Sequence, residues 1–340
     1  MTCKILSGLF IALMLLSFLG ACENATEKVN GNIVTIVDGK GQSVNVSIPV
    51  ERIASISSRA SEIVYALGAG DSIVGRDSYS FFPPALQDVQ VVAESSYKPN
   101  IELIHKLKPD LVIADSMLSG DDRKKMESAG IPVIIETSWD STTVATPVRH
   151  IGLLLDKVDR AEEIIGFIEG YQGTVKERIS SLEEKDKPEV FFEWSKPYYS
   201  MGNGTLFHNL TVAAGGINIV ADQPVKYPTM DPEWLVEIDP DIIVRYVSNT
   251  AKENLTENMV DMRNEIVSRP ELADLKAIKD GRVYILGNPI ASGIRSVVGD
   301  LYLAKWFHSD LFKDIDPEAV HRELLDKFFG QELDGVYVYP

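Results

Sequence analysis

The sequence predicts an α/β protein with two similar lobes, each built around a central parallel sheet, joined by a single long linker helix. Short β-prone runs alternate with helical patterns along most of the 340 residues, which is typical of parallel sheets. Residues 102–113 (ELIHKLKPDLVI) and 233–244 (EWLVEIDPDIIV) share Glu, Pro and Asp and match at their apolar positions. A long amphipathic helical pattern lies between these two copies.

The chain begins with an export signal. Lys4 precedes an apolar run over 5–19, which suits a signal peptide and is shorter than the roughly 20 residues that span a bilayer. The run ends in Leu-Gly-Ala-Cys at 19–22, which resembles the lipobox of exported lipoproteins. That resemblance implies cleavage before Cys22 and lipidation of its thiol. A plain secretory signal is the alternative.

The next elements are a hairpin and a strand–helix unit. After a polar tether at 23–32, two β-prone runs at 34–37 and 44–46 flank the turn Asp-Gly-Lys-Gly, which predicts a β-hairpin. A strand over 52–56 leads through a loop to a helix that we expect Ser61 to cap and Gly68 to end.

Each repeat copy predicts a helix, a Pro-Asp turn and a buried strand. The copies are offset by 131 residues, which favours two lobes of similar build over a solenoid. Chance similarity of two helix–strand units is the alternative. Further strands are expected over 132–135, 189–192 and 282–286.

The linker helix is predicted over about 159–185. Its apolar residues recur every three or four positions from Ala161 to Leu182, and Pro188 stops it. About 27 residues at 1.5 Å each give a strut of roughly 40 Å. Packing within a single domain is the alternative. The expected boundaries are a signal peptide at 1–21, the lipidated cysteine, tether and hairpin at 22–50, an N-terminal lobe at 51–158, the linker helix at 159–187 and a C-terminal lobe at 188–340.

Composition excludes several functions. Lys and Arg number 33 and Asp and Glu number 50, so the net charge of −17 disfavours nucleic acid as a partner. The two cysteines, at 3 and 22, leave no disulfide or thiolate metal site in the body of the chain. The five histidines lack ligand spacing, so we expect no metal site, and no cofactor is implied. Without a hydrolase, zincin or P-loop motif, we do not expect an enzyme.

Taken together, these features resemble the helical-backbone, or class III, substrate-binding proteins of ABC importers, which bind ferric siderophores, vitamin B12 and related corrinoids. The matching segments lie at 37–41, 52–53, 66–75, 107–113, 129–133 and 277–284. The resemblance implies a ligand cleft between the lobes and a monomer that is exported and lipid-anchored to the outer face of the cytoplasmic membrane. It also implies delivery of the ligand to an ABC permease dimer with its ATPase.

The resemblance also predicts ligand and docking residues. The expected ligand is a ferric siderophore. A corrinoid or an oxyanion such as molybdate is the alternative, and a structural surface lipoprotein is an alternative of another class. Glu102 and Glu233, which begin the two repeat copies, match the family's permease-docking glutamates. Loops after strands supply the expected ligand-binding residues, which are Ser58, Arg59, Tyr79, Tyr97, Met117, Trp139, Trp194, Tyr227, Tyr246 and Arg295. Aromatic faces suit bulky ligands, and arginines suit anionic groups.

Overall fold

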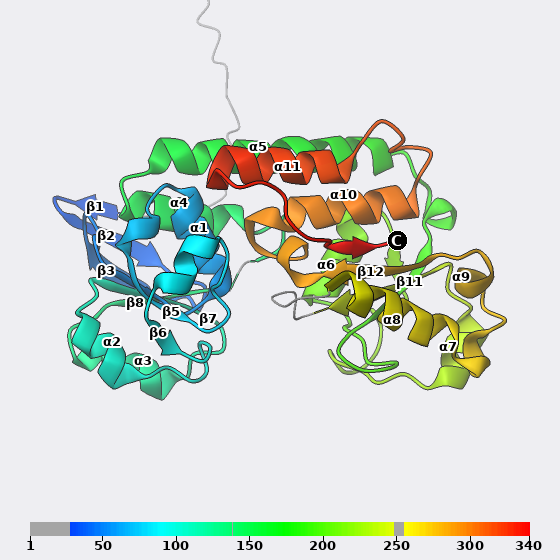
Figure 1. Cartoon of the computed structure of the whole chain (residues 1–340), viewed down its shortest axis with the longest axis horizontal. Coiled ribbons are helices and arrows are strands. Elements are labelled where there is room, and N and C mark those ends of the chain that lie inside the picture. The colour runs from blue at the N-terminus through cyan, green and yellow to red at the C-terminus, as the bar shows by residue number, and fades with distance from the viewer. Residues whose placement is uncertain (1–27, 138, 248–254) are drawn as a thin grey trace, which may run out of the picture.

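The computed structural model describes residues 28–137, 139–247 and 255–340. They form two α/β lobes that lie side by side beneath the long helix α5 (Val158–Ile179), as Figure 1 shows. The sequence prediction of two lobes around parallel sheets is confirmed. Cys22 and the export signal lie outside the described residues.

The first lobe contains a five-stranded parallel sheet in the order β6-β5-β4-β7-β8. Its strands are β4 (Ile53–Ser55), β5 (Ile73–Asp77), β6 (Val91–Ala93), β7 (Leu111–Asp115) and β8 (Val133–Glu136). The helices around it are α1 (Ser58–Ala66), α2 (Ile101–Leu107), α3 (Gly120–Ser128) and α4 (Ala145–Leu154). The strands β4, β7 and β8 are buried throughout, as expected for a parallel sheet covered on both faces.

The predicted hairpin is confirmed and packs on this lobe. Strands β2 (Ile33–Val37) and β3 (Ser43–Ser47) are antiparallel, and β1 (Lys28–Asn30) pairs with β2. The buried turn residue Asp38 forms an ion pair with Arg123 of α3 at 2.7 Å, and its carboxylate also accepts a hydrogen bond from the backbone of Ile135. The turn is therefore attached to the lobe by charge as well as by packing.

The second lobe has a five-stranded sheet in the order β10-β9-β11-β12-β13, parallel except for the edge strand β13. The strands are β9 (Glu189–Glu193), β10 (Ile217–Asn218), β11 (Ile242–Val247), β12 (Val283–Gly287) and β13 (Val338–Tyr339). The helices are α6 (Leu206–Ala213), α7 (Pro232–Ile238), α8 (Leu255–Val267), α9 (Lys276–Lys279), α10 (Ser296–Phe307) and α11 (Pro317–Phe329).

The internal repeat has the same local structure in both lobes. Asn100 and Asp231, which occupy the same repeat position, cap α2 and α7 with their side chains. Lys108 and Asp239 end these helices in the left-handed conformation, with φ of 49° and 54°.

The aspartate of each Pro-Asp turn also has the same role. Asp110 accepts hydrogen bonds from the backbone of Glu51 and Arg52 at the start of β4, and Asp241 accepts one from the backbone of Glu189 at the start of β9. The shared sequence therefore encodes a shared helix–turn–strand unit that holds the neighbouring central strand.

Helix α5 ends earlier than predicted. It stops at Ile179, although the apolar pattern continues to Leu182. Ser180 follows as the C-cap, and its hydroxyl donates to the backbone of Glu177. Serine is a weak helix former because its side chain competes for backbone hydrogen bonds, which explains the earlier end. The helix is 22 residues long, or about 33 Å.

A second helix, α11, lies along α5 and reaches the first lobe (Figure 1). Phe329 at its end contacts Tyr65 of α1 with ring centroids 6.2 Å apart. Arg160 of α5 donates to the backbone of Lys327. One buried apolar cluster accordingly runs from the hairpin through both lobes to α11. Hinge motion would have to break these contacts, so the lobes are held at a nearly fixed spacing.

The start of α1 also differs from prediction. The helix begins at Ser58, with Ser57 as its N-cap, and Ser61 lies inside it. The Ser61 side chain is fully buried and hydrogen-bonds to Ser55 and Ser80. These buried partners from strand β4 and the β5 loop, rather than a free helix end, satisfy the hydroxyl. None of the helices among the described residues is long and apolar enough to cross a membrane.

Candidate ligand site between the lobes

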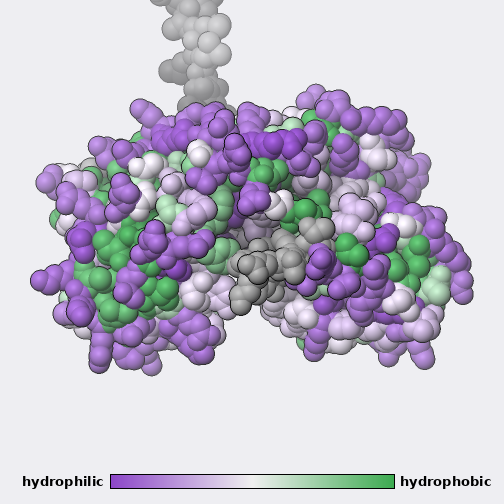
Figure 2. Space-filling view, in the orientation of Figure 1, coloured by the Kyte–Doolittle hydropathy of each residue, from purple (hydrophilic) through white to green (hydrophobic). Residues whose placement is uncertain are grey.

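The carboxyl ends of β4, β5 and β12 meet at the junction of the two lobes. Their loops line a small pocket of about 50 Å³. The lining residues are Ser58, Arg59, Glu62, Tyr79, Phe81, Phe82, Asn288, Pro289, Ser292 and Arg295. Figure 2 shows the surface hollowed between the lobes on the side away from α5. The carboxyl ends of strands are where open α/β sheets place their ligands.

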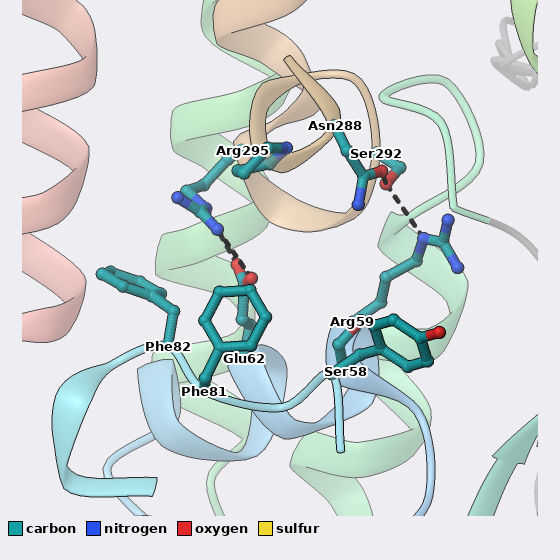
Figure 3. A pocket seen from close by; sticks show the side chains of 10 residues that line it. Ser58, Arg59, Glu62, Phe81, Phe82, Asn288, Ser292 and Arg295 are labelled. Carbon is teal, nitrogen blue, oxygen red and sulfur yellow. Dashed lines mark hydrogen bonds and ion pairs between the residues drawn. The ribbon is translucent and has the colours of Figure 1, made fainter. Parts of the chain in front are cut away.

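Arg59 bridges the lobes and keeps part of its charge free. Its Nε donates to the hydroxyl of Ser292 at 2.9 Å (Figure 3). The guanidinium also lies 5.9 Å from the ring of Trp139, which follows β8. No hydrogen bond within the described parts of the chain engages its two terminal nitrogens. Arg59 can therefore offer a paired donor to an anionic group.

Arg295 has a partner across the junction. Its Nε and Nη2 donate to the two carboxylate oxygens of Glu62 at 2.9 and 2.7 Å (Figure 3). Only 3% of the Arg295 side chain is exposed, and its guanidinium lies 4.4 Å from the centroid of Phe82. This arginine lines the pocket as predicted, but its charge is already paired. Arg59 is therefore the better placed of the two to bind an anionic group.

Aromatic residues of the second lobe form a continuous line toward this pocket. Tyr227, with half its surface exposed, lies 6.2 Å from Trp194, and Trp194 lies 6.4 Å from Phe207. Phe207 in turn lies 5.0 Å from Tyr246, whose hydroxyl donates to the pocket residue Asn288. Burial raises the pKa of Tyr246 to about 12, against an opposing effect of Arg59, so its hydroxyl stays protonated.

The loop that carries Trp194 is held by a buried charge cluster. Glu193 is fully buried and forms ion pairs with Arg245 and, at 2.7 Å, with Arg269. Its carboxylate also accepts the backbone N–H of Tyr198, a residue with a φ of +60°. These bonds fix the turn after β9 and with it the direction of Trp194.

The remaining predicted contacts lie on the first lobe with large exposed fractions. Tyr79 is 54% exposed and lines the pocket. Tyr97 and Met117 are 47% and 52% exposed and follow β6 and β7. The Tyr97 hydroxyl donates to Glu94, which also pairs with Lys98. The structure does not bring Tyr97 or Met117 into the junction pocket, and both remain predicted contacts for a ligand larger than that pocket.

The loop after β8 makes a second set of contacts between the lobes. The carbonyl of Trp139 accepts the N–H of Gly293 at 2.6 Å, and Asp140 accepts from Asn209 of α6. Ser141 donates to Asp300 of α10. Burial raises the pKa of Asp300 to about 7, although the bond from Ser141 lowers it. Three consecutive residues therefore fasten the first lobe to the second.

Sequence reasoning missed several junction residues, among them Glu62, Phe82, Asn288 and Pro289. For Glu62 the sequence did contain a signal. Arg59 and Glu62 are three residues apart, so they lie on one face of the helix, and the predicted ligand contact at Arg59 also points to Glu62. Among the described residues, no group of three His, Cys, Asp or Glu side chains could hold a metal ion.

The predicted docking glutamates occupy matching places on the two lobes. Glu102 lies in the first turn of α2 and Glu233 in the first turn of α7. Both are exposed. Figure 1 places the two helices on the side of their lobes away from α5. Within the described chain neither carboxylate has an ion-pair partner.

A family model described as "Periplasmic binding protein" matches residues 53–290. The chain belongs to this family. The "Uncharacterized ABC transporter substrate-binding lipoprotein YvrC" of Bacillus subtilis is 27% identical over 325 residues, covering 91% of this chain and 99% of that protein. A "Vitamin B12-binding protein" of Yersinia pestis is 26% identical over 207 residues, covering 60% of this chain and 71% of that protein.

The solved molybdate-bound periplasmic binding protein MolA of Haemophilus influenzae has the same fold. It superposes with a TM-score of 0.76 at 17% identity, covering 88% of this chain and 99% of that one. As a member of the periplasmic binding protein family, this chain is an ABC-transporter substrate-binding protein and not an enzyme. Its output is ligand capture, and a permease with its ATPase is the implied partner.

Proposed function

We propose that the chain is the extracytoplasmic, lipid-anchored receptor of an ABC importer for a metal chelate, and that the chelate is a corrinoid. The observation that carries the choice is the pairing of Arg295 with Glu62, which leaves one partly free guanidinium, that of Arg59, at the junction. A ferric siderophore with several anionic groups needs more positive charge in its binding site than this one guanidinium supplies. A cobalamin presents a broad ring, neutral amides and a single phosphodiester.

The exposed aromatics favour the same ligand class. Tyr79 and Tyr227 each have about half their surface exposed on opposite lobes, and the Trp194 ring lies 6.2 Å from that of Tyr227, tilted by 45°. Aromatic faces contact large flat ligands at low entropic cost. The junction pocket, at about 50 Å³, is far smaller than the several hundred Å³ of an enclosed small-molecule site. We therefore infer that the chelate lies in the open hollow above it and inserts one polar group toward Arg59.

A small oxyanion is the second candidate because of the same pocket. Its size and its position beside Arg59 suit a single tetrahedral anion. A ferric siderophore, the ligand expected from sequence, remains a candidate through the free end of Arg59. These ligands differ in size and charge, so binding experiments separate them.

The delivery step follows from the fold and the two glutamates. The lobes are held together by α5, α11 and the junction contacts. Ligand binding therefore changes the spacing of the lobes little, and its main effect is that the ligand fills the hollow between them. We propose that Glu102 and Glu233 then orient the loaded protein on the two permease subunits, since exposed charges act chiefly through steering and register. The relative named as a lipoprotein supports Cys22 as the anchor, and we propose that the chain acts as a monomer.

The test is a ligand panel with the soluble chain from Glu23 onward. Intrinsic Trp fluorescence and thermal shift are recorded with cyanocobalamin, cobinamide, ferric siderophores and molybdate, with absorbance controls for the coloured ligands. We expect saturable, submicromolar binding of the corrinoids, weakened at least tenfold by Arg59→Ala for cobalamin. Preference for siderophores or molybdate would replace the corrinoid assignment. If none of these ligands binds, the result would contradict the chelate-receptor proposal.

A further inference from the structure

A second cavity lies where α5, α6 and α10 meet, and among the described residues it shares no lining residue with the junction pocket. Its volume is about 430 Å³, which is the size of a site for a small organic molecule. The loop residue Thr142, next to Ser141, completes the wall. The cavity therefore lies at the Ser141–Asp300 contact that fastens the lobes together.

Most of the cavity wall is apolar. Val175 and Ile179 of α5 face it together with Val212 of α6, which is 51% exposed. Gly173 also lines it, and a Cβ built at this glycine would meet no atom within 4 Å. A hydrocarbon chain could therefore lie along this wall and remove apolar surface from water.

The cavity wall also contains buried polar atoms without hydrogen-bond partners among the described residues. Asp300 is 97% buried, its Oδ2 accepts from Ser141, and its Oδ1 has no hydrogen-bond partner in the described chain. The amide nitrogen of Gln172, a donor in the same wall, is also buried without a described partner. A buried acceptor without a partner is costly, so a ligand that donates a hydrogen bond to Asp300 Oδ1 gains affinity.

The charged residues around the cavity favour a ligand with a positive charge. Glu169 and Lys176 stand exposed at its rim, and Asp300 lies within it, so acidic groups outnumber basic ones among the lining residues. The net charge of the chain, −17, also favours cations. An ammonium group supplies the N–H donors that a carboxylate accepts.

We propose that this cavity binds a small amphipathic organic cation, with a primary ammonium group toward Asp300 and a hydrocarbon chain along Val175, Ile179 and Val212. Such a ligand touches helices of the second lobe and the loop of the first lobe at one place. It therefore strengthens the contact between the lobes without entering the chelate site.

Calorimetric titration with n-hexylammonium at about pH 8, where Asp300 is ionised, tests the proposal, with 1-hexanol as the uncharged probe of the same length. We expect saturable one-to-one binding of the amine, at least tenfold tighter than that of the alcohol. Asp300→Asn should remove this preference for the amine. Equal affinity for both probes, or no saturable binding of the amine, would overturn the proposal.

Two glycine variants locate the binding. Gly173→Leu should fill the cavity and abolish amine binding, and it should fold because glycine is the weakest non-proline residue in a helix interior. Gly166→Leu is the matched control, since it lies on the same helix with open space at its Cβ but outside the cavity. Unchanged binding in Gly173→Leu, or equal loss in both, would contradict the assignment. Chelate titration of the same samples reports the proposed function separately.

Discussion

The ion pair between Glu62 and Arg295 should be a main determinant of how firmly the two lobes are joined. Both side chains are largely buried, at 14% and 3% exposure, and two hydrogen bonds link them. Replacing Arg295 with Met keeps much of its apolar stem but leaves the carboxylate of Glu62 buried without its partner. Breaking a buried pair in this way costs about 3–5 kcal/mol.

Loss of the contact with Phe82 adds to this. The guanidinium lies 4.4 Å from that ring, and a desolvated cation–π contact contributes on the order of 1 kcal/mol. We therefore expect Arg295→Met to lower the free energy of unfolding by about 4–6 kcal/mol, the aromatic contact included. Glu62→Gln should cost somewhat less, because an amide still accepts one hydrogen bond.

The double variant separates pairing from packing. Removing both charges, as in Glu62→Leu with Arg295→Met, should restore much of the stability, because replacing a buried pair by apolar residues is often neutral. Urea unfolding followed by Trp fluorescence of the unaltered chain, Glu62→Leu, Arg295→Met and the double variant gives the four free energies of a double-mutant cycle. A loss below 1 kcal/mol in Arg295→Met, or single effects that simply add, would refute the reasoning.

Three further predictions concern the junction and the docking face. Gly293→Ala should lower the free energy of unfolding in urea by about 1–2 kcal/mol, because Gly293 has a left-handed φ of +73°. The control Gly166→Ala, inside α5, should leave this free energy unchanged or raise it, and equal effects of the two substitutions would contradict the prediction. Glu102→Ala with Glu233→Ala should leave chelate affinity unchanged and reduce uptake in vesicles with the permease, while Glu237→Ala on α7 should not; loss of solution binding would make the pair structural. The pKa of Asp300 is raised to about 7 in the folded protein from its ordinary 3.8. Between about pH 4 and pH 7 the folded state therefore binds one more proton than the unfolded state, so the free energy of unfolding should fall as the pH rises through this range. Asp300→Asn should flatten that slope in urea unfolding across this range, and an unchanged slope would contradict the assignment.

The fold could be predicted because its signals are local and repeated. The Pro-Asp turn after residues 102–107 and again after 233–238 carries its own helix end, strand start and bracing aspartate. The apolar stripe of α5 was equally plain, and only the last six predicted residues, from Ser180 on, lie outside the helix. The role of α11 was not predictable, because its packing along α5 depends on tertiary contacts such as Phe329 with Tyr65.

The site was only partly predictable, for an electrostatic reason. Ser58, Arg59, Tyr79 and Arg295 line one pocket because each follows a strand at its carboxyl end, and their contact with a ligand stays a prediction. The partner of Arg295 is Glu62, 233 positions away in sequence, and no local pattern indicates such a pairing. Tertiary structure thus decides whether an arginine is free to bind a ligand or is paired with another residue of the chain. That distinction moves the proposed ligand from a siderophore to a corrinoid.

The central claim is that a corrinoid occupies the hollow between the lobes and contacts the exposed ring of Tyr227. Calorimetric titration of cyanocobalamin into the chain from Glu23 and into its Tyr227→Ala variant tests this directly. Tyr227 is 51% exposed, so its loss should spare the fold, and Val225→Ala, at 56% exposure in the same loop, is the matched control. We predict one-to-one submicromolar binding that weakens at least tenfold in Tyr227→Ala alone. Absent binding, or the same affinity in all three proteins, would contradict it.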